Sequence, residues 1–449
     1  MKKVSVVLPT YNRAKYLQLS LASLTQQTFP ESDYEIIVVD DGSSDNTQDV
    51  VSQWCDKFLN IKYLFQPNEG YCVARARNRG ITAAQGEYLL FIDSGMIASS
   101  QLIEEHFLTH TKYPEGVGIG VIYMAPDQDI INQKLEMDRY NLSEQELAAL
   151  TLYEDWRKPL FDLVEGHLGI LNAPWITFST GNVFLSKQQL SNVGFFDEDF
   201  RNWGNEDTEL GYRLYRAGVL FCLNQNAIAI HCEHPNSDTV PDRELARYET
   251  RELFFKKHPH IIGELIAADG TWFTERVLRE LNFLIGKPLI PNYLASEYSD
   301  FRELLAGLIG RKLFIGFGTE ATAKKLGASA CLEAVESMEQ SSVHTVHGID
   351  FYNLIGIHTP FPDQFFDYII ITDFWRSLSI DLVYRMLTES LRIGKTTLLV
   401  YSDNFDASSF NHSTAHHKHD LMMLLVGLRK YQLEKYRLTC CEVYRFKEW

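Results

Sequence analysis

Strands and helices alternate along the first 92 residues, and this feature constrains the fold more than any other. Short β-branched runs predict strands at Val4–Leu8, Glu35–Val39, Lys62–Phe65 and Tyr88–Ile92, separated by predicted helices near 13–27, 46–57 and 71–84. Strands joined by helices form a mainly parallel sheet that is covered on both faces. Ligands of such sheets bind beyond the carboxyl ends of the strands. We therefore expect the polar segments that follow these strands to line one crevice.

The α/β pattern continues beyond residue 92 and starts again in a second domain. A sheet-like block at Ile176–Leu185 and Val219–Ile230 brackets a predicted helix near 205–217, and a new alternation of strands and helices starts at Lys312. The sequence therefore predicts an α/β protein with these parts: a first domain at 1–240 with an acidic helical insertion at 127–170, a helical linker at 241–300, and a second α/β domain at 301–449.

The charge of the chain is uneven and excludes one class of partner. The net charge is -17, and all but one of these charges belong to residues 1–300. A non-specific nucleic-acid binder needs a basic face, so this class is excluded. No apolar run approaches the roughly 20 residues of a spanning helix, and Pro9 follows the N-terminus too soon for a signal peptide. We expect a cytoplasmic protein that is not an integral membrane protein.

Two pairs of neighbouring carboxylates lie at a strand end and at a helix start, where α/β proteins commonly have ligand-binding or catalytic groups. Asp40 and Asp41 end a predicted buried strand, and a carboxylate there can accept a hydrogen bond from a base or a ribose. Glu206 and Asp207 begin a predicted helix, whose positive end keeps carboxylates ionised. By themselves both pairs are also typical of helix capping and solvation.

Four segments in the first domain resemble family 2 glycosyltransferases in order and spacing. They are VVLPTYNR (6–13), EIIVVDDGSSD (35–45), NEGYCVARARNRG (68–80) and AQGEYLLFID (84–93). The resemblance implies the GT-A fold, a Rossmann-like sheet that binds a nucleotide sugar. It also implies a donor site for a UDP-sugar. In that site Pro9 and Tyr11 contact the uracil, Asp41 accepts from the base, Arg77 lies near the diphosphate or base, and Asp93 with Ser94 contacts the ribose or a metal.

A second resemblance lies in the box WGNED (203–207), which matches the acceptor region of the same superfamily. It implies that Asp207 takes the proton from the acceptor and that Glu206 orients a sugar hydroxyl. Trp203 offers an apolar face for a pyranose ring, and Gly204 lets the backbone approach closely.

The metal site implied by the resemblance is incomplete in this sequence. The family's Asp-x-Asp segment, whose second carboxylate binds Mn²⁺ or Mg²⁺, reads Asp93-Ser94-Gly95 here. Glycine has no side chain to coordinate an ion. The remaining candidates are Asp93 and a histidine after the last strand of the domain, His231, with His234 as the alternate. Either the histidine compensates for Gly95 or the metal site is degraded.

The last third of the chain resembles a class I methyltransferase, again a Rossmann-like domain. The loop that would bind S-adenosylmethionine is altered, because Phe314 replaces the expected acidic residue and Glu320 the third glycine. We expect a non-catalytic domain for packing, acceptor docking or homo-oligomerisation. The alternative is a bifunctional glycosyltransferase and methyltransferase.

These features predict an inverting glycosyltransferase that moves a hexose or N-acetylhexosamine from a UDP-sugar by single displacement. The acceptor is a hydroxyl or a thiol, on a saccharide or on a peptide Ser or Cys. The specific alternatives are a peptide glycosyltransferase of bacteriocin (glycocin) biosynthesis and a pseudoenzyme that only binds nucleotide sugar.

Overall fold

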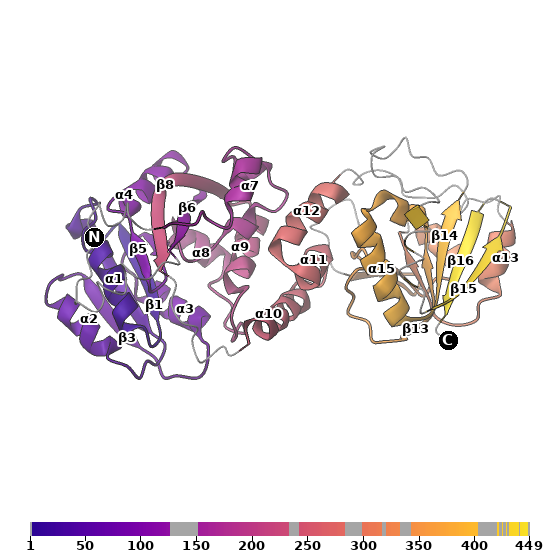
Figure 1. Cartoon of the computed structure of the whole chain (residues 1–449), viewed down its shortest axis with the longest axis horizontal. Helices are drawn as coiled ribbons and strands as arrows, with labels where there is room; N and C mark the ends of the chain where they lie inside the picture. Colours follow the sequence, from indigo (N-terminus) through magenta and orange to yellow (C-terminus); the bar gives the residue numbers. More distant parts are fainter. Residues whose placement is uncertain are drawn as a thin grey trace. The chain divides into compact units, whose positions relative to one another are not determined.

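The chain folds into two compact units, Met1–Thr250 and Arg251–Trp449, in a computed structural model. Many of the elements are labelled in Figure 1. The structure describes residues 2–125, 151–232, 242–282, 299–316, 320–332, 343–402 and 420–447, the last range without 422–423, 425–427, 429–430 and 440. The predicted insertion at 127–170 is therefore described only from residue 151 onward.

The first unit is built on an eight-stranded sheet of order β3-β2-β1-β4-β7-β6-β8-β5. Its strands are β1 Val4–Thr10, β2 Tyr34–Asp40, β3 Ile61–Phe65, β4 Tyr88–Phe91, β5 Met96–Ala98, β6 Gly116–Ala125, β7 Val183–Ser186 and β8 Leu220–Cys232. Its helices are α1 Ala14–Leu24, α2 Thr47–Cys55, α3 Val73–Ala83, α4 Leu102–Lys112, α7 Lys158–Leu163, α8 Lys187–Val193 and α9 Glu206–Arg216, followed by α10 Arg243–Lys257.

Helices cover both faces of β1 and β2, as the continuous apolar runs of these strands predict. Successive side chains of a strand point to opposite faces. Val6 and Val38 belong to one core cluster with Leu21 of α1. On the other face α3 approaches so closely that a Cβ at Gly80 would lie 2.5 Å from a Val7 methyl. The sheet is therefore the middle layer of three.

The strand register brings the predicted ligand-binding segments together. β1 pairs in parallel with both β2 and β4, and Thr10 stands opposite Asp40. The backbone N–H of Asp41 donates to the Thr10 carbonyl oxygen at 2.9 Å. The segments that follow β1, β2 and β4 consequently start at one edge of the sheet.

One expected strand is wrong in part. The block Ile176–Leu185 was expected to be extended, but residues Pro174–Thr177 form a 3₁₀ turn and only Val183–Ser186 joins the sheet, as β7. Pro174 stands in the first turn of this 3₁₀ helix, where its fixed φ favours a helical start. Trp175 is fully buried there, so the apolar residues of this segment serve packing rather than strand pairing.

The second unit contains another eight-stranded sheet, of order β11-β12-β10-β9-β13-β14-β16-β15. Its strands are β9 Lys312–Ile315, β10 Ala330–Leu332, β11 Val343–Val346, β12 Ile349–Tyr352, β13 Phe366–Ile371, β14 Gly394–Ser402, β15 Gln432–Arg437 and β16 Cys441–Lys447. Its helices are α11 Ile261–Asp269, α12 Thr271–Leu281, α13 Ser299–Ala306, α14 Glu320–Lys325 and α15 Ile380–Ile393.

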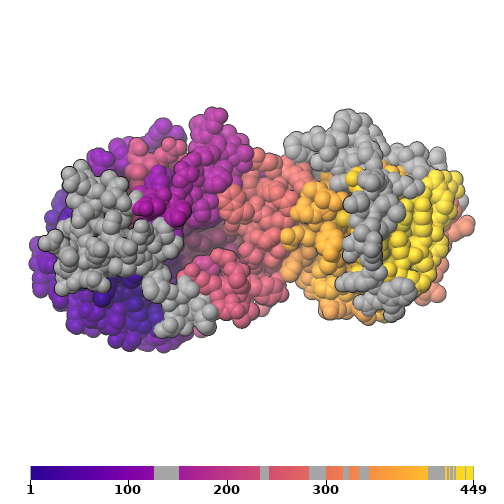
Figure 2. Space-filling model, viewed as in Figure 1, coloured from indigo at the N-terminus to yellow at the C-terminus, as the bar shows by residue number. Residues whose placement is uncertain are grey.

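The second sheet is mixed. The strands from β12 to β14 run parallel, whereas β11 and β16 are antiparallel to their neighbours. The edge strand β15 contributes to the yellow surface in Figure 2. Two α/β sheets confirm the predicted α/β class, whereas the Rossmann-like character of the second domain stays a prediction. The predicted boundaries at 240 and 300 stay a prediction.

A buried carboxylate ties α11 to a loop of the second unit. Glu264 is fully buried, and its two oxygens accept hydrogen bonds from the backbone N–H groups of Ile355, Gly356, Ile357 and His358 at 2.7–3.2 Å. Arg385 of α15 adds an ion pair to Asp269 at the end of the same helix. The helix is thus bonded to the unit that contains the second sheet.

We expect Glu264→Gln to destabilise the second unit by about 1–3 kcal/mol, because one oxygen becomes an amide that faces backbone donors. The measurement is the hydrogen exchange of the amides at 355–358 in the full chain, together with thermal unfolding. The matched control is Glu303→Gln, on the exposed side of α13. Equal protection of these amides in both variants would contradict the expectation.

Candidate active site

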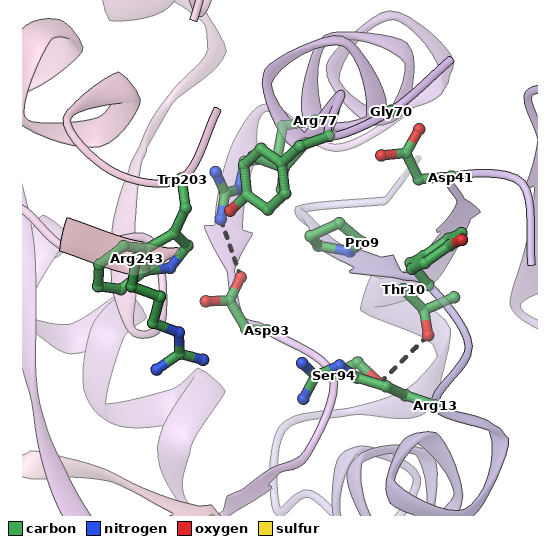
Figure 3. Close-up of a pocket in the computed structure, with 13 residues that line it drawn as sticks. Pro9, Thr10, Arg13, Asp41, Gly70, Arg77, Asp93, Ser94, Trp203 and Arg243 are labelled. Atoms are coloured by element: carbon green, nitrogen blue, oxygen red, sulfur yellow. Dashed lines mark hydrogen bonds and ion pairs between the residues drawn. The ribbon is translucent and has the colours of Figure 1, made fainter. Parts of the chain in front are cut away.

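A cavity of about 190 Å³ lies at the carboxyl edge of the first sheet (Figure 3). Polar segments that follow β1, β2 and β4 line it, which confirms the expected crevice. Seven of the predicted site residues are among its lining residues: Pro9, Tyr11, Asp41, Arg77, Asp93, Ser94 and Trp203. The other lining residues are Thr10, Arg13, Gly70, Tyr71, Val73 and Arg243.

One end of the cavity is formed by Tyr11 and Asp41. The Asp41 carboxylate accepts from the Gln66 amide at 2.6 Å and from the backbone N–H of Cys72, at the start of α3, at 3.0 Å. Burial raises the pKa of Asp41, although both hydrogen bonds oppose this shift. The next residue, Gly42, has φ +85° and leaves no room for a Cβ beside the Asn68 backbone. The turn after β2 therefore requires glycine and fixes Asp41.

Arg77 is the most buried cation of the site and joins two distant parts of the sequence. It is 3 % exposed, and its guanidinium contacts Asp93 at 3.0 Å and Glu206 at 2.9 Å. Its guanidinium also lies 5.4 Å from the ring centroid of Phe196. Burial alone would lower the pKa of Arg77, but the carboxylates of Asp93 and Glu206 raise it above its ordinary value. Arg77 consequently holds the end of β4 against the start of α9.

The WGNED box turns sharply into α9. Gly204 and Asn205 both have positive φ, of +100° and 67°, a conformation that favours glycine and that asparagine tolerates. The Asn205 amide donates to the Thr250 hydroxyl at 2.9 Å, which fixes the turn. Glu206 and Asp207 are therefore presented by the first turn of a helix whose start is anchored.

The two carboxylates of the box differ in their surroundings. One oxygen of Glu206 contacts Arg77, and the other is buried and has no hydrogen-bond partner among the described residues. Asp207 is partly buried and accepts from the backbone N–H of Thr208 at 2.7 Å. Burial and the neighbouring Glu206 charge raise the pKa of Asp207 to about 7. Asp207 is thus the group of this pair that can exchange a proton near neutral pH.

Two arginine guanidinium groups lie against the ring of Trp203. The guanidinium groups of Arg243 and Arg247, both from α10, lie 5.0 and 4.9 Å from the ring centroid. Such contacts are attractive because the ring face is electron-rich. The predicted stacking of a pyranose on Trp203 stays a prediction, and any sugar at this ring has these cations as neighbours.

The described residues do not fit a divalent-metal site. Asp93 already contacts Arg77. His231 lies within β8, in register with Met96 of β5. Gly95 has φ +97° and accepts through its backbone oxygen from the Cys232 N–H. Among the described residues no group of three His, Cys, Asp or Glu side chains is placed to hold an ion. His234 lies outside the described residues.

The sequence motifs imply no role for Arg13, Tyr71 or Arg243. Arg13 stands in the YNR segment directly after β1, so its position at the ligand edge was a usable signal. Tyr71 lies among charged groups. Burial, and to a smaller extent the charge of Glu206, raises the pKa of its hydroxyl well above the ordinary value. Arg243 begins α10, far from every motif, and only the fold brings it to the cavity.

In the described parts of the chain, no helix is both long and apolar enough to span a membrane.

Comparisons with known proteins match both halves of the first unit. The family described as glycosyl transferase family 2 matches residues 5–163, and the N-terminal domain of galactosyltransferase matches residues 170–235. Validoxylamine A glucosyltransferase of Streptomyces hygroscopicus subsp. jinggangensis is 33% identical over 82% of this chain and 90% of its own length. Chondroitin synthase of Escherichia coli is 33% identical over 57% of this chain and 38% of its length.

Among solved structures, that of S. aureus TarS residues 1–349 in complex with UDP-GlcNAc is 17% identical, with a TM-score of 0.43, and covers 68% of this chain and 79% of that chain. The Streptomyces relative is matched over nearly its full length, and the family match includes the strands, turns and Asp93 that build the cavity. The chain therefore belongs to glycosyltransferase family 2.

Proposed function

We propose that this glycosyltransferase moves a hexose or N-acetylhexosamine from a UDP-sugar to an acceptor hydroxyl by a single, inverting displacement. The observation that carries the proposal is the position of Asp207 on the first turn of α9. Its neighbour Glu206 contacts Arg77, which lines the cavity. A carboxylate with a pKa of about 7 is poised to act as a base near neutral pH.

In this reaction Asp207 takes the proton of the acceptor hydroxyl as its oxygen attacks the anomeric carbon. A new C–O bond forms on one face of the sugar while the bond to the diphosphate breaks on the other. The bonding electron pair leaves with UDP. Tyr11 and Asp41 would hold the uracil at the far end of the cavity, and Glu206 would orient a sugar hydroxyl. No step is assigned to a metal ion, because the described donor set does not fit one.

The names of the relatives bear on the sugar and on the acceptor. The Streptomyces relative is named as a glucosyltransferase that acts on validoxylamine A. Two further relatives are named as synthases of chondroitin and hyaluronan. None of these three names refers to a peptide. The first name favours glucose as the donor sugar. All three names favour a non-peptide acceptor over the peptide and thiol alternatives.

We assign the second unit a non-catalytic role. Its strand order β12-β10-β9-β13-β14 supports a Rossmann-like reading. At the end of β9, however, the side-chain position of Gly316 is occupied, since a Cβ there would lie 2.2 Å from the Cβ of Phe374. Residues Asp373–Ser377 are all buried beside this strand. The described residues at this edge give no support for a methyl-donor cofactor, and measurable binding of S-adenosylmethionine would overturn the assignment.

A thermal-shift screen tests which nucleotide sugar the protein binds. We expect UDP-glucose to raise the unfolding midpoint of the first unit by about 5–10 °C at a hundredfold excess over Kd, because ligands stabilise the folded state that binds them. GDP-glucose is the matched control for the base. Transfer of a labelled sugar to an acceptor, or its hydrolysis, then separates an enzyme from a protein that only binds donor. Indifference to every UDP-sugar would overturn the proposal.

A further inference from the structure

Two arginines line the cavity without forming an ion pair to any described carboxylate. Arg13 and Arg243 line the same cavity as Asp93 and Ser94 (Figure 3). Among the described residues neither guanidinium forms an ion pair, in contrast to Arg77, whose charge is matched by two carboxylates. One terminal nitrogen of Arg13, Nη1, is buried and has no hydrogen-bond partner in the part of the chain that the structure describes. A buried donor without a partner is costly unless a ligand satisfies it.

The backbone beside Arg13 is held in place. Asn12 has φ 48°, and its side-chain oxygen accepts from the backbone N–H groups of Ser44 and Asp45. The Asp45 carboxylate in turn accepts from the N–H of Ala14 at 3.0 Å. The turns after β1 and β2 are therefore bonded to each other on both sides of Arg13. This anchoring makes Arg13 part of a built site rather than a free surface side chain.

Arg13 is a partly buried cation with a second cation, Arg243, beside it. Burial lowers its pKa to about 10, with the Asp93 carboxylate opposing this shift and the positive charge of Arg243 adding to it. The group stays charged at neutral pH. Two neighbouring cations repel each other and are stabilised when an anion lies between them. Guanidinium groups also match phosphate oxygens in geometry, since each presents several N–H donors in one plane.

The same region lacks the carboxylate that would bring in a divalent cation. Gly95 follows Asp93 and Ser94 at the end of β4, and the Asp93 carboxylate already contacts Arg77. A doubly charged diphosphate in this cavity thus needs positive charge from the protein itself. Arg13 and Arg243 are the lining cations whose charge is not already matched within the described residues.

We infer that Arg13 and Arg243 bind the diphosphate of the donor and stabilise the departing UDP, so that donor binding does not depend on a divalent ion. This inference rests on the proposed function. It assigns to two side chains the charge neutralisation that the missing carboxylate at position 95 would otherwise deliver through a metal. The arginines act on the oxygens that gain charge as the bond to the sugar breaks.

The test is a series of ligands that differ only in phosphate number. Binding of uridine, UMP and UDP is measured by calorimetry in excess EDTA, for the full chain and for Arg13→Gln and Arg243→Gln. We expect each substitution to weaken UDP binding by about 10- to 100-fold, because a hydrogen bond to a charged group is lost. Uridine affinity should stay within about twofold and shows that the site is folded. Arg79→Gln, an exposed arginine of α3 outside the cavity lining, is the matched control.

The outcomes separate the inference from the proposed function. Unchanged UDP affinity in both arginine variants overturns the inference and leaves the UDP-sugar proposal standing. UDP binding that vanishes in EDTA and returns with Mn²⁺ overturns it as well. Failure of the unaltered chain to bind either uridine or UDP overturns the proposed function, and the inference with it.

Discussion

Asp207→Asn is expected to lower the rate of sugar transfer by about 10²- to 10⁴-fold, the range that a positioned general base contributes. Asparagine keeps the size of the side chain and can still accept from the Thr208 N–H. It cannot take up the proton of the acceptor. UDP affinity should stay within about twofold, because Asp207 is not among the residues that line the cavity. The measurement is kcat with a labelled donor, with UDP binding by calorimetry.

The pH dependence gives a second readout of the same group. The pKa of Asp207 is raised to about 7 by burial and by Glu206. The carboxylate can accept a proton only when it is ionised, so the transfer rate should fall as the pH drops through about 7. The residual rate of Asp207→Asn should lose this acidic limb. Asp49→Asn, an exposed aspartate of α2, is the matched control. Full activity in Asp207→Asn would refute the base assignment.

Arg77→Met is expected to destabilise the first unit by about 3–5 kcal/mol, because removing one member of a buried ion pair leaves the other charge uncompensated. In a unit of this size that loss corresponds to about 6–20 °C in the unfolding midpoint. Two carboxylates lose their partner at once, Asp93 and Glu206, and one oxygen of Glu206 already lacks a hydrogen bond within the described ranges. The measurement is thermal unfolding of the full chain, followed by a probe in the first unit.

A double variant separates the charge effect from lost packing. Arg77→Met combined with Glu206→Gln removes one of the stranded charges, so it should recover part of the loss in midpoint. Arg79→Met, on the exposed side of α3, should leave the midpoint within about 1–2 °C. A midpoint of Arg77→Met that equals that of Arg79→Met would show that the buried ion pairs do not hold β4 against α9.

The sequence predicted the elements whose signals are local. Continuous apolar runs marked β1, β2 and β4, and their register then brings Asp41 and Asp93 to one edge. Helix α9 was expected near 205–217 and is found at Glu206–Arg216. The local pattern predicted a strand at Ile176, and this was wrong because the apolar residues there pack as a 3₁₀ turn.

Contacts between distant residues could not be predicted in this way. The Arg77 ion pair with Glu206 joins residues 129 positions apart. Nothing in the ARARNRG run distinguishes Arg77 from its neighbours except the family resemblance, yet only Arg77 of the three arginines there lines the cavity. The position of Arg243 at the cavity depends on where α10 begins, after the long strand β8. Such residues become visible only when the packing of α3, α9 and α10 around the cavity is known.

The ion pairs of Arg77 also restrict which regions of this enzyme can be exchanged with those of another transferase. Its two partners belong to separately matched regions, since Asp93 lies within 5–163 and Glu206 within 170–235. A chimera that exchanges the second region for that of another transferase must bring a carboxylate to the position of Glu206. Without it, the new second region would fold against an arginine whose charge is only half matched. The two regions are therefore not independent modules, and an exchange of the second has to be designed together with α3.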